Sequence, residues 1–452
     1  MKKKFINLST TQIIMLSFLA VIFIGSLILT LPISTVEGSR VSYSDALFTA
    51  TTATCVTGLV TLPTVTTWSF FGQVVILCLI QLGGLGVVTV VSGFMIALHK
   101  KIGITDRLLL QDAFNLNTLS GLVKFVKKVI MGTILVEGIG ALLYMTVFVP
   151  EFGVRGIWIS IFNSVSAFCN AGIDIIAENS LCNYAHNPMI NFTTCMLIIV
   201  GGIGYIVWWD LIRVLSLIKK QGLQCFKRLT MHSKIAIWMT VLLILSGTLA
   251  FFVLEYNNPL TIGEETLFNK LQISFFQSVT TRTAGFATVP QENLTNASAM
   301  VSMIFMFVGG SPVGTAGGVK TVTIAVLLIT ASSMIKNKNE ITVFNRSIHQ
   351  KAVKKAITVF SMSFTIMMVS SILLALVTDA PLVDILYETV SATATVGLTR
   401  NLTATLNIWG KLIIIVTMYL GRVGPISLAL VLNSKKEKWN TVKTPYEEIS
   451  VG

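Results

Sequence analysis

One short motif occurs four times in the chain at almost constant spacing. Each copy is a run of small or hydroxyl-bearing residues that leads into a glycine. The glycines are 114, 113 and 112 residues apart, and they are Gly58, Gly172, Gly285 and Gly397. Repetition at a fixed period indicates copies of one structural unit. We therefore expect four units, with the boundaries 1–100, 101–220, 221–337 and 338–452.

The composition places these units in a membrane. Hydrophobic residues make up 53% of the 452 residues and charged residues only 12%, whereas soluble domains carry about 25% charged residues. Each unit holds two apolar runs that are long enough to cross a bilayer. The first series comprises Ile13–Leu31, Val129–Val149, Ile235–Leu254 and Ala356–Val377. The second comprises Trp68–Leu98, Met189–Ile218, Met300–Ile335 and Leu412–Leu432. The run at Ile13 exceeds the core of a signal peptide, so we keep it as one of eight spans.

The positive charge is concentrated in alternate loops. The net charge is +13, and 25 of the 33 Lys and Arg residues lie in five segments, at 2–4, 100–128, 213–234, 336–355 and 435–443. This placement follows the positive-inside rule, which puts both termini in the cytoplasm of a multi-pass cell-membrane protein. It also removes the need for a nucleic-acid partner. Anionic lipid headgroups or a cytoplasmic protein partner remain as alternatives for this charge.

A short helix is predicted before each motif glycine. The four segments are Tyr43–Ala53, Gly156–Ala167, Lys270–Thr280 and Leu382–Ala392. All are too short to cross a bilayer, so each must re-enter from the side it came from. Non-helical backbone at this depth is tolerated only inside protein or along a wet cavity. The predicted fold is thus all-α, with eight spans and four re-entrant helices around one central pore.

The motif turns suit the binding of a cation by backbone carbonyl oxygens. Such oxygens replace the hydration shell of an ion, and glycine supplies the backbone freedom that a tight turn needs. The negative ends of four helix dipoles would also face the axis. The alternative is that the glycines serve only tight packing. The residues predicted to form this ring are Thr54, Cys55, Val56, Thr57, Gly58, Phe168, Cys169, Asn170, Ala171, Gly172, Thr281, Arg282, Thr283, Ala284, Gly285, Thr393, Ala394, Thr395, Val396 and Gly397. Arg282 is expected to point away from the axis.

A second glycine series lies in the following spans, and its third copy is extended into a break. Gly83 and Gly201 head the first two copies, for which close helix packing is the alternative explanation. The third copy continues as a glycine-rich stretch in mid-membrane, which favours a gate. In the fourth copy Arg422 replaces a glycine, and it either holds the broken span or raises a positive barrier. The predicted gate residues are Gly309, Gly310, Ser311, Gly314, Thr315, Gly317, Gly318, Lys320 and Arg422.

The polar residues of the sequence do not indicate an enzyme active site. The six cysteines and four histidines form no cluster at metal-ligand spacing, and no nucleophile can be combined with a base and a group that orients it. Glu137 and Glu388 lie in predicted membrane segments, where a hydrogen bond between helices is the common outcome for a carboxyl group. Asp210 and Arg213 are expected to pair with each other.

Taken together, the motifs resemble those of the Trk/Ktr/HKT superfamily of potassium transporters. The strings TCVTG, FCNAG, TRTAG and TATVG, with GGSPVGTAGG and GRVGP, carry this resemblance over nearly the whole chain. In its length the chain looks most like the bacterial Ktr membrane subunit of the KtrB or KtrD type. The resemblance implies K+ as the transported ion, a membrane homodimer, and a cytoplasmic ring of RCK-type, KtrA- or KtrC-like regulatory subunits that bind nucleotides. It leaves Na+ dependence open and locates no Na+ site.

Two mechanisms of transport remain open on the sequence. The first is a passive, gated pore for K+ uptake. The second is a Na+/K+ symporter that works by alternating access, because transporters of that class also use broken helices at mid-membrane. Each unit has an even number of spans, so the copies run parallel to one another, which favours the pore.

Overall fold

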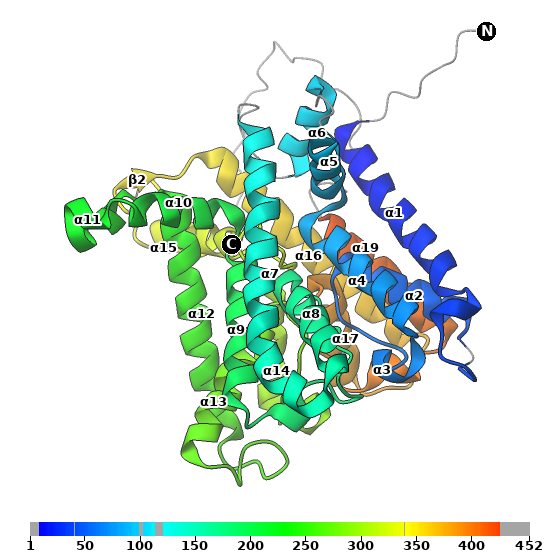
Figure 1. The fold of residues 1–452 in the computed structure, drawn as a ribbon. Coiled ribbons are helices and arrows are strands. Elements are labelled where there is room, and N and C mark those ends of the chain that lie inside the picture. Colours follow the sequence, from blue (N-terminus) through cyan, green and yellow to red (C-terminus); the bar gives the residue numbers. More distant parts are fainter. Residues whose placement is uncertain (1–8, 40, 99–102, 114–120, 339, 425–452) are drawn as a thin grey trace.

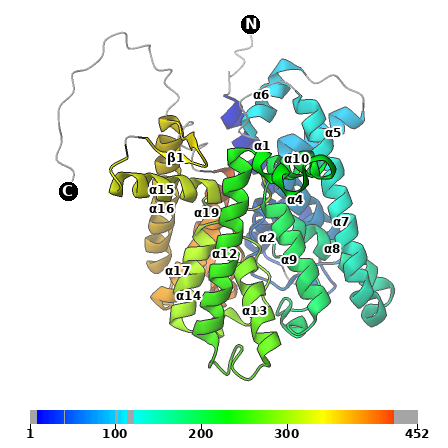
Figure 2. The same ribbon diagram turned by 90° about the vertical axis from the view of Figure 1, so that its left-hand side faces the viewer.

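The structure is a computed structural model that describes residues 9–39, 41–98, 103–113, 121–338 and 340–424. Four helices are long and apolar enough to cross a membrane, namely α1 (Thr10–Leu29), α7 (Leu122–Phe152), α12 (Met231–Glu255) and α16 (Gln350–Ala375). They coincide with the first series of predicted spans. In Figures 1 and 2 these long helices form much of the outer wall of a helical molecule.

Four shorter helices lie inside this wall and lead to the motif glycines. They are α2 (Tyr43–Cys55), α8 (Val154–Cys169), α13 (Leu267–Thr280) and α17 (Leu382–Ala394). Each has at least one large side chain buried in the core, namely Phe48, Phe162, Phe276 and Tyr387. Three of the helices end at a residue with left-handed backbone geometry, at Val56, Asn170 and Thr395. Left-handed residues at this position terminate a helix and turn the chain. The predicted short helices are therefore present, with ends displaced by less than one turn.

The second series of predicted spans is interrupted in the structure. The first two members are bent pairs, α4 (Phe70–Leu85) with α5 (Val87–Ala97) at 97° and α9 (Pro188–Gly202) with α10 (Tyr205–Leu215) at 98°. Gly86 and Gly204 lie at the bends with φ of +83° and +93°. A backbone at these angles cannot continue a right-handed helix, and apolar composition alone did not reveal this.

The third and fourth members of this series differ from the first two. The third consists of α14 (Asn296–Phe307) and α15 (Thr321–Ile335), separated by a loop. The fourth is α19 (Ile408–Val423), and the rest of its predicted span lies outside the described residues. Gly424 follows α19 with φ of +89°, close to the values at Gly86 and Gly204. A glycine with positive φ therefore follows each of α4, α9 and α19.

The remaining elements are short connections. They are η1 (Pro32–Ser34), α3 (Thr64–Thr67), α6 (Ile104–Ala113), η2 (Cys182–Tyr184), α11 (Ile218–Gln221), η3 (Gly222–Arg228), η4 (Gln291–Asn293) and α18 (Leu402–Thr405). The expectation of an all-α fold needs one correction, because β1 (Thr342–Val343) pairs antiparallel with β2 (Arg346–Ser347). Phe344 and Asn345 between them both have positive φ, which is the geometry of a tight two-residue hairpin turn.

The second glycine series allows the short helices to pack closely. A Cβ atom on Gly83, Gly201 or Gly421 would overlap a backbone carbonyl of a short helix, that of Thr54, Phe168 or Thr393 respectively. These three carbonyls each lie four residues before a motif glycine. Close packing, which the sequence left open for Gly83 and Gly201, is thus present at all three positions, and it fixes α4, α9 and α19 against the ends of α2, α8 and α17.

Candidate functional site

The four motif glycines lie together around one axis, and all four have positive φ, between +64° and +97°. A Cβ on Gly58 would lie 2.5 Å from the carbonyl oxygen of Ala171 and 3.2 Å from the Cα of Gly397. Gly172 approaches Ala284 O in the same way, and Gly285 approaches Val396 O. Gly397 closes the sequence of contacts against Thr57 O. Each glycine therefore faces the carbonyl that precedes the glycine of the next unit, and no other residue fits there.

Three of the four turns are anchored by a hydroxyl group six residues before the glycine. The amides of Gly58 and Gly397 donate to Thr52 Oγ1 and Ser391 Oγ, each at 3.0 Å. In the second unit Ser166 Oγ accepts from the amide of Ile173 at 3.1 Å. These bonds come from the helix that immediately precedes each turn. The conformation of each turn is thus set locally, within one unit.

The third turn is built differently. Val279 occupies the position of the anchoring hydroxyl, and α13 ends five residues before Gly285 rather than three. Thr280 Oγ1 instead donates to Phe286 O at 2.6 Å, beyond the glycine. Arg282 is buried, and its guanidinium donates to Thr240 Oγ1 of α12 at 3.3 Å. Its side chain is therefore directed toward a neighbouring helix and not toward the other glycines.

The other predicted side chains of the ring also pack against neighbouring helices. Cys169 Sγ donates to Gln81 Oε1 at 3.4 Å, and Val56 and Asn170 contact the positions of Gly83 and Gly202. The hydroxyls of Thr54, Thr57, Thr393 and Thr395 are buried without a hydrogen-bond partner among the described residues. The structure thus brings together the glycines and the carbonyls before them, and it does not bring together the side chains of the motif.

A hollow of about 290 Å³ opens on one side of the four glycines, and all four contribute to its lining. Its wall carries the carboxyl groups of Asp174, Glu178 and Glu292. Asp174 belongs to the loop after the second motif glycine, and burial raises the pKa of its carboxyl group to about 6. The sequence analysis did not single out Asp174, although its place two residues after Gly172 is a signal that could have found it.

The predicted gate residues form a loop on the other side of the glycines. Its neck is closed by Val308 and Val319, which pair as an isolated β-bridge. The loop fills the break between α9 and α10, because Ser311 N donates to Gly202 O at 2.8 Å and Tyr205 N donates to Val313 O at 2.9 Å. Backbone groups that the break leaves unpaired are therefore satisfied by the loop.

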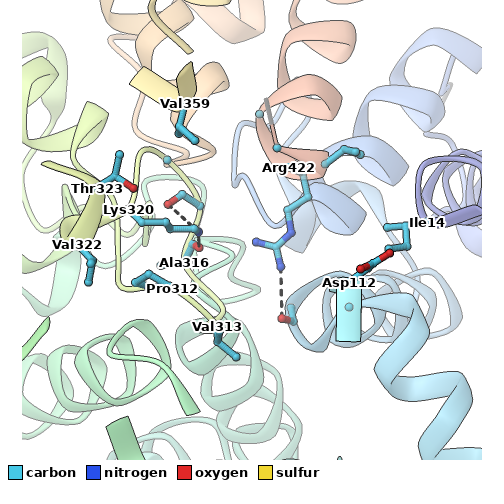
Figure 3. A pocket seen from close by; sticks show the side chains of 18 of the residues that line it. Ile14, Asp112, Pro312, Val313, Ala316, Lys320, Val322, Thr323, Val359 and Arg422 are labelled. Carbon is cyan, nitrogen blue, oxygen red and sulfur yellow. Dashed lines mark hydrogen bonds between the residues drawn. The ribbon is translucent and has the colours of Figure 1, made fainter. Parts of the chain in front are cut away.

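Two basic side chains hold this loop. Arg422 of α19 donates from Nη1 to Thr315 O at 2.7 Å, and from Nη2 to Gly83 O and Gly84 O at the end of α4. Lys320 Nζ donates to Ala316 O at 2.6 Å and Gly317 O at 3.3 Å. Figure 3 shows both side chains extending into one cavity. Both cations are thus bonded to backbone carbonyls of the loop, and Arg422 also to carbonyls in the last turn of α4, where carbonyls lack helical partners.

This inner cavity has a volume of about 450 Å³. Its lining includes much of the loop, the bend between α4 and α5, and the end of α19. The loop therefore lines one cavity, and the four glycines line the other.

Comparison with known proteins identifies the family. The model of the TrkH family, described as a cation transport protein, matches residues 3–441. The chain belongs to the TrkH family of cation transport proteins. The potassium/sodium uptake protein NtpJ of Enterococcus hirae is 38% identical, over 99% of this chain and 98% of that protein. Ktr system potassium uptake protein B of Bacillus subtilis is 37% identical, over 99% and 98%.

A solved structure supports the same fold. The crystal structure of the potassium transporter TrkH from Vibrio parahaemolyticus matches with a TM-score of 0.76 at 15% identity, over 96% of this chain and 86% of that one. Membership of this family, together with the apolar helices, makes this chain an integral membrane protein. Resemblance to potassium transporters, predicted from the motifs alone, is confirmed.

Several polar contacts in this TrkH-family chain join different units around the glycines. Lys411 Nζ donates to Asp45 Oδ1 at 2.6 Å, which ties α19 to α2. Arg400 Nε donates to Asp384 Oδ1 at 2.7 Å, and its Nη1 donates to Gln291 O and Leu294 O of the third unit. The sequence analysis missed both ion pairs. A lone lysine near the end of an apolar run was the available signal for Lys411.

The carboxyl groups left open by the sequence are hydrogen-bonded. Glu137 accepts from Gln81 Nε2 at 3.2 Å, and Glu388 accepts from the hydroxyls of Thr399 and Thr403. Asp210 pairs with Arg213 as expected. Among the described residues no group of three or more His, Cys, Asp or Glu side chains could hold a metal ion.

Proposed function

We propose that this chain is the ion-conducting subunit of a potassium uptake system and that K+ passes along the axis between the four motif glycines. The observation that carries this proposal is the closed sequence of contacts in which each glycine faces the carbonyl before the next. The names of two relatives, a potassium/sodium uptake protein and a Ktr system potassium uptake protein, point to the same ion.

Selection of K+ is assigned to the backbone oxygens at these turns. The carbonyls of Thr57, Ala171, Ala284 and Val396 already contact the adjacent glycines, and carbonyl rings of this kind replace the hydration shell of an ion. The C-terminal ends of α2, α8, α13 and α17 lead directly into the turns. Each helix end contributes about −0.5 of a charge, which favours a cation and opposes an anion.

Flow through the inner half is controlled by the loop at 309–320. The loop lies beside the inner cavity, and Arg422 and Lys320 hold it in place. When the loop is displaced, K+ moves inward under the membrane potential, which supplies about 2.3 kcal/mol per charge per 100 mV. The chain itself then needs no energy-yielding reaction.

The arrangement of the subunit in its membrane follows from the same proposal. The four units would surround the pore, with both termini in the cytoplasm, because the basic loops alternate along the chain. Two copies of the chain would form a homodimer with one pore per subunit. A cytoplasmic ring of RCK-type nucleotide-binding subunits would act on the inner loop from the basic face.

Substitution of a motif glycine tests the function. Gly58→Ser places a Cβ 2.5 Å from Ala171 O and 3.2 Å from the Cα of Gly397, so we expect the K+/Na+ flux ratio in proteoliposomes to fall toward one. Gly38→Ala is the matched control, because Gly38 has a similar φ of +87° and nothing within 4 Å of its Cβ position. An unchanged ratio in Gly58→Ser would overturn the assignment.

The second candidate is a Na+/K+ symporter that works by alternating access. The name of NtpJ includes sodium, and the bent pairs α4–α5 and α9–α10 are breaks of the kind that such transporters use. A symporter would drive K+ uphill when only a Na+ gradient is imposed. The passive pore would move K+ only down its own electrochemical gradient.

A further inference from the structure

The loop at 309–320, the inner loop, contacts the motif turns directly. Thr315 Oγ1 donates to the carbonyl of Phe168 at 3.0 Å. Gly317 N donates to Thr283 Oγ1 at 3.1 Å. The loop thus shares one hydrogen bond with the turn of the second unit and one with the turn of the third.

The bond to Phe168 acts on the end of a short helix. Phe168 lies in the last turn of α8, four residues before Gly172, and carbonyls in a last helical turn have no partner within the helix. Thr315 is fully buried, so water cannot replace its hydroxyl while the loop stays in place. A loop that moves away therefore leaves this carbonyl without its donor.

The bond to Thr283 reaches the turn that lacks an anchoring hydroxyl six residues before its glycine. In the third unit Val279 stands where the other units have an anchoring hydroxyl, and Thr283 itself has a φ of +69°. Thr283 lies two residues before Gly285. The loop amide at Gly317 is therefore one of the groups that fix this turn.

Thr315 also belongs to the contacts that hold the loop. Its carbonyl accepts from Arg422 Nη1 at 2.7 Å, and its amide donates to Gly201 O at 3.2 Å. One residue thus joins α19, the end of α9 and the end of α8. Any displacement that breaks the Arg422 contact also moves the Thr315 hydroxyl.

We infer that Thr315 and Thr283 are positioning residues that couple the inner loop to the motif turns, so that displacement of the loop changes the ion preference of the ring. This inference rests on the proposed pore and adds a link between its two parts. Because coupling between two sites is reciprocal, the ion that occupies the ring must also bias the position of the loop.

Paired threonine substitutions test the coupling. The K+/Na+ flux ratio would be measured in proteoliposomes for Thr315→Val, Thr315→Ser, Thr283→Val and Thr330→Val. Thr330 is the matched control, since its hydroxyl only donates to Val326 O within α15. We expect the ratio to fall about two- to tenfold in Thr315→Val and Thr283→Val, the range that corresponds to one hydrogen bond. Thr315→Ser and Thr330→Val should keep the wild-type ratio.

The outcomes separate the coupling from the pore itself. A change in total K+ flux with an unchanged ratio in both valine variants would overturn the coupling and leave the pore standing. An unchanged ratio in Gly58→Ser would overturn the pore. If Thr315→Val does not fold, Thr283→Val still tests the coupling. This substitution removes the bond between Gly317 N and Thr283 Oγ1 by changing the turn and not the loop.

Discussion

The motif turns and the inner loop are both irregular backbone inside a helical membrane protein, but they are held in opposite ways. Thr52 and Ser391 anchor their turns from the helix just before them, six residues away. The loop at 309–320 is held by Arg422, more than a hundred residues along the chain, and by the broken end of α9. A locally anchored segment stays rigid when other units move, whereas a remotely anchored one can be released. This difference suits a fixed ring and a movable gate.

The third unit differs from the others both in its motif turn and in its second span. Its turn has Val279 in place of the anchoring hydroxyl, and its second span contains the loop. The two departures meet where Gly317 N donates to Thr283 Oγ1. The turn of the third unit is therefore held both by Thr280 of its own helix and by the loop.

The largest predicted effect comes from removing the remote anchor. Arg422→Ala deletes charge-assisted hydrogen bonds to Thr315 O, Gly83 O and Gly84 O. Hydrogen bonds to charged groups are worth about 1.5–3 kcal/mol, so passive K+ flux without a regulatory partner should rise about 10- to 100-fold. Flux into proteoliposomes measures this.

Arg422→Lys sharpens the same prediction. Lysine keeps the positive charge but cannot reproduce the planar fork that reaches two segments at once, so an intermediate rise is expected. If Arg422→Lys equals wild type while Arg422→Ala is open, the charge acts as a barrier and the hydrogen bonds do not hold the loop. Unaltered flux in both variants would contradict the assignment of Arg422 to the gate.

Removal of a local anchor should have a smaller effect and a different one. Ser391→Ala leaves the buried amide of Gly397 without its acceptor, which costs about 1 kcal/mol or more. The K+/Na+ flux ratio is expected to fall about fivefold while the gate remains closed. Ser246→Ala is the control, because Ser246 is exposed and donates only to Leu243 O within its own helix. Equal ratios in both variants would show that the turn does not depend on its anchor.

The smallest effect is expected in the hollow that the four motif glycines line. The pKa of Asp174 is raised to about 6 by burial, so its carboxyl group is charged above that pH and neutral below it. A single charge beside water contributes a few tenths of a kcal/mol, and uptake at low external K+ should fall about twofold as the external pH drops through 6. Asp174→Asn should show the low-pH rate at every pH. Persistence of the full pH dependence in that variant would assign it to another group.

Much of the fold could be predicted because it follows from the apolar composition and from the repeated motif. The four long helices and the four short ones follow from apolar runs and from the spacing of Gly58, Gly172, Gly285 and Gly397. The bends at Gly86 and Gly204 could not be predicted, since an apolar run shows no difference between a straight helix and a broken one. The hairpin at 342–347 depends on two left-handed residues that carry no strong turn pattern.

The four glycines at the centre of the site could be predicted from the sequence. The side-chain contacts that hold the turns and the loop in place could not. A glycine repeated four times indicated where backbone must approach backbone, and the positive φ values give the reason. The partners of Thr315 and Thr283 depend on contacts between different units, and spacing along the chain does not reveal them. The pairing of Lys411 with Asp45, 366 residues apart, is of the same kind.

The central claim is that K+ crosses this chain passively through the ring of carbonyl oxygens. The most direct test is the reversal potential of the wild-type chain in a planar bilayer under separate K+ and Na+ gradients. The account predicts that the reversal potential shifts by about 59 mV for each tenfold K+ gradient, the value for an ion that carries one charge. A Na+ gradient should shift the reversal potential almost not at all. Uphill K+ movement driven by the Na+ gradient would contradict the account and establish the symporter.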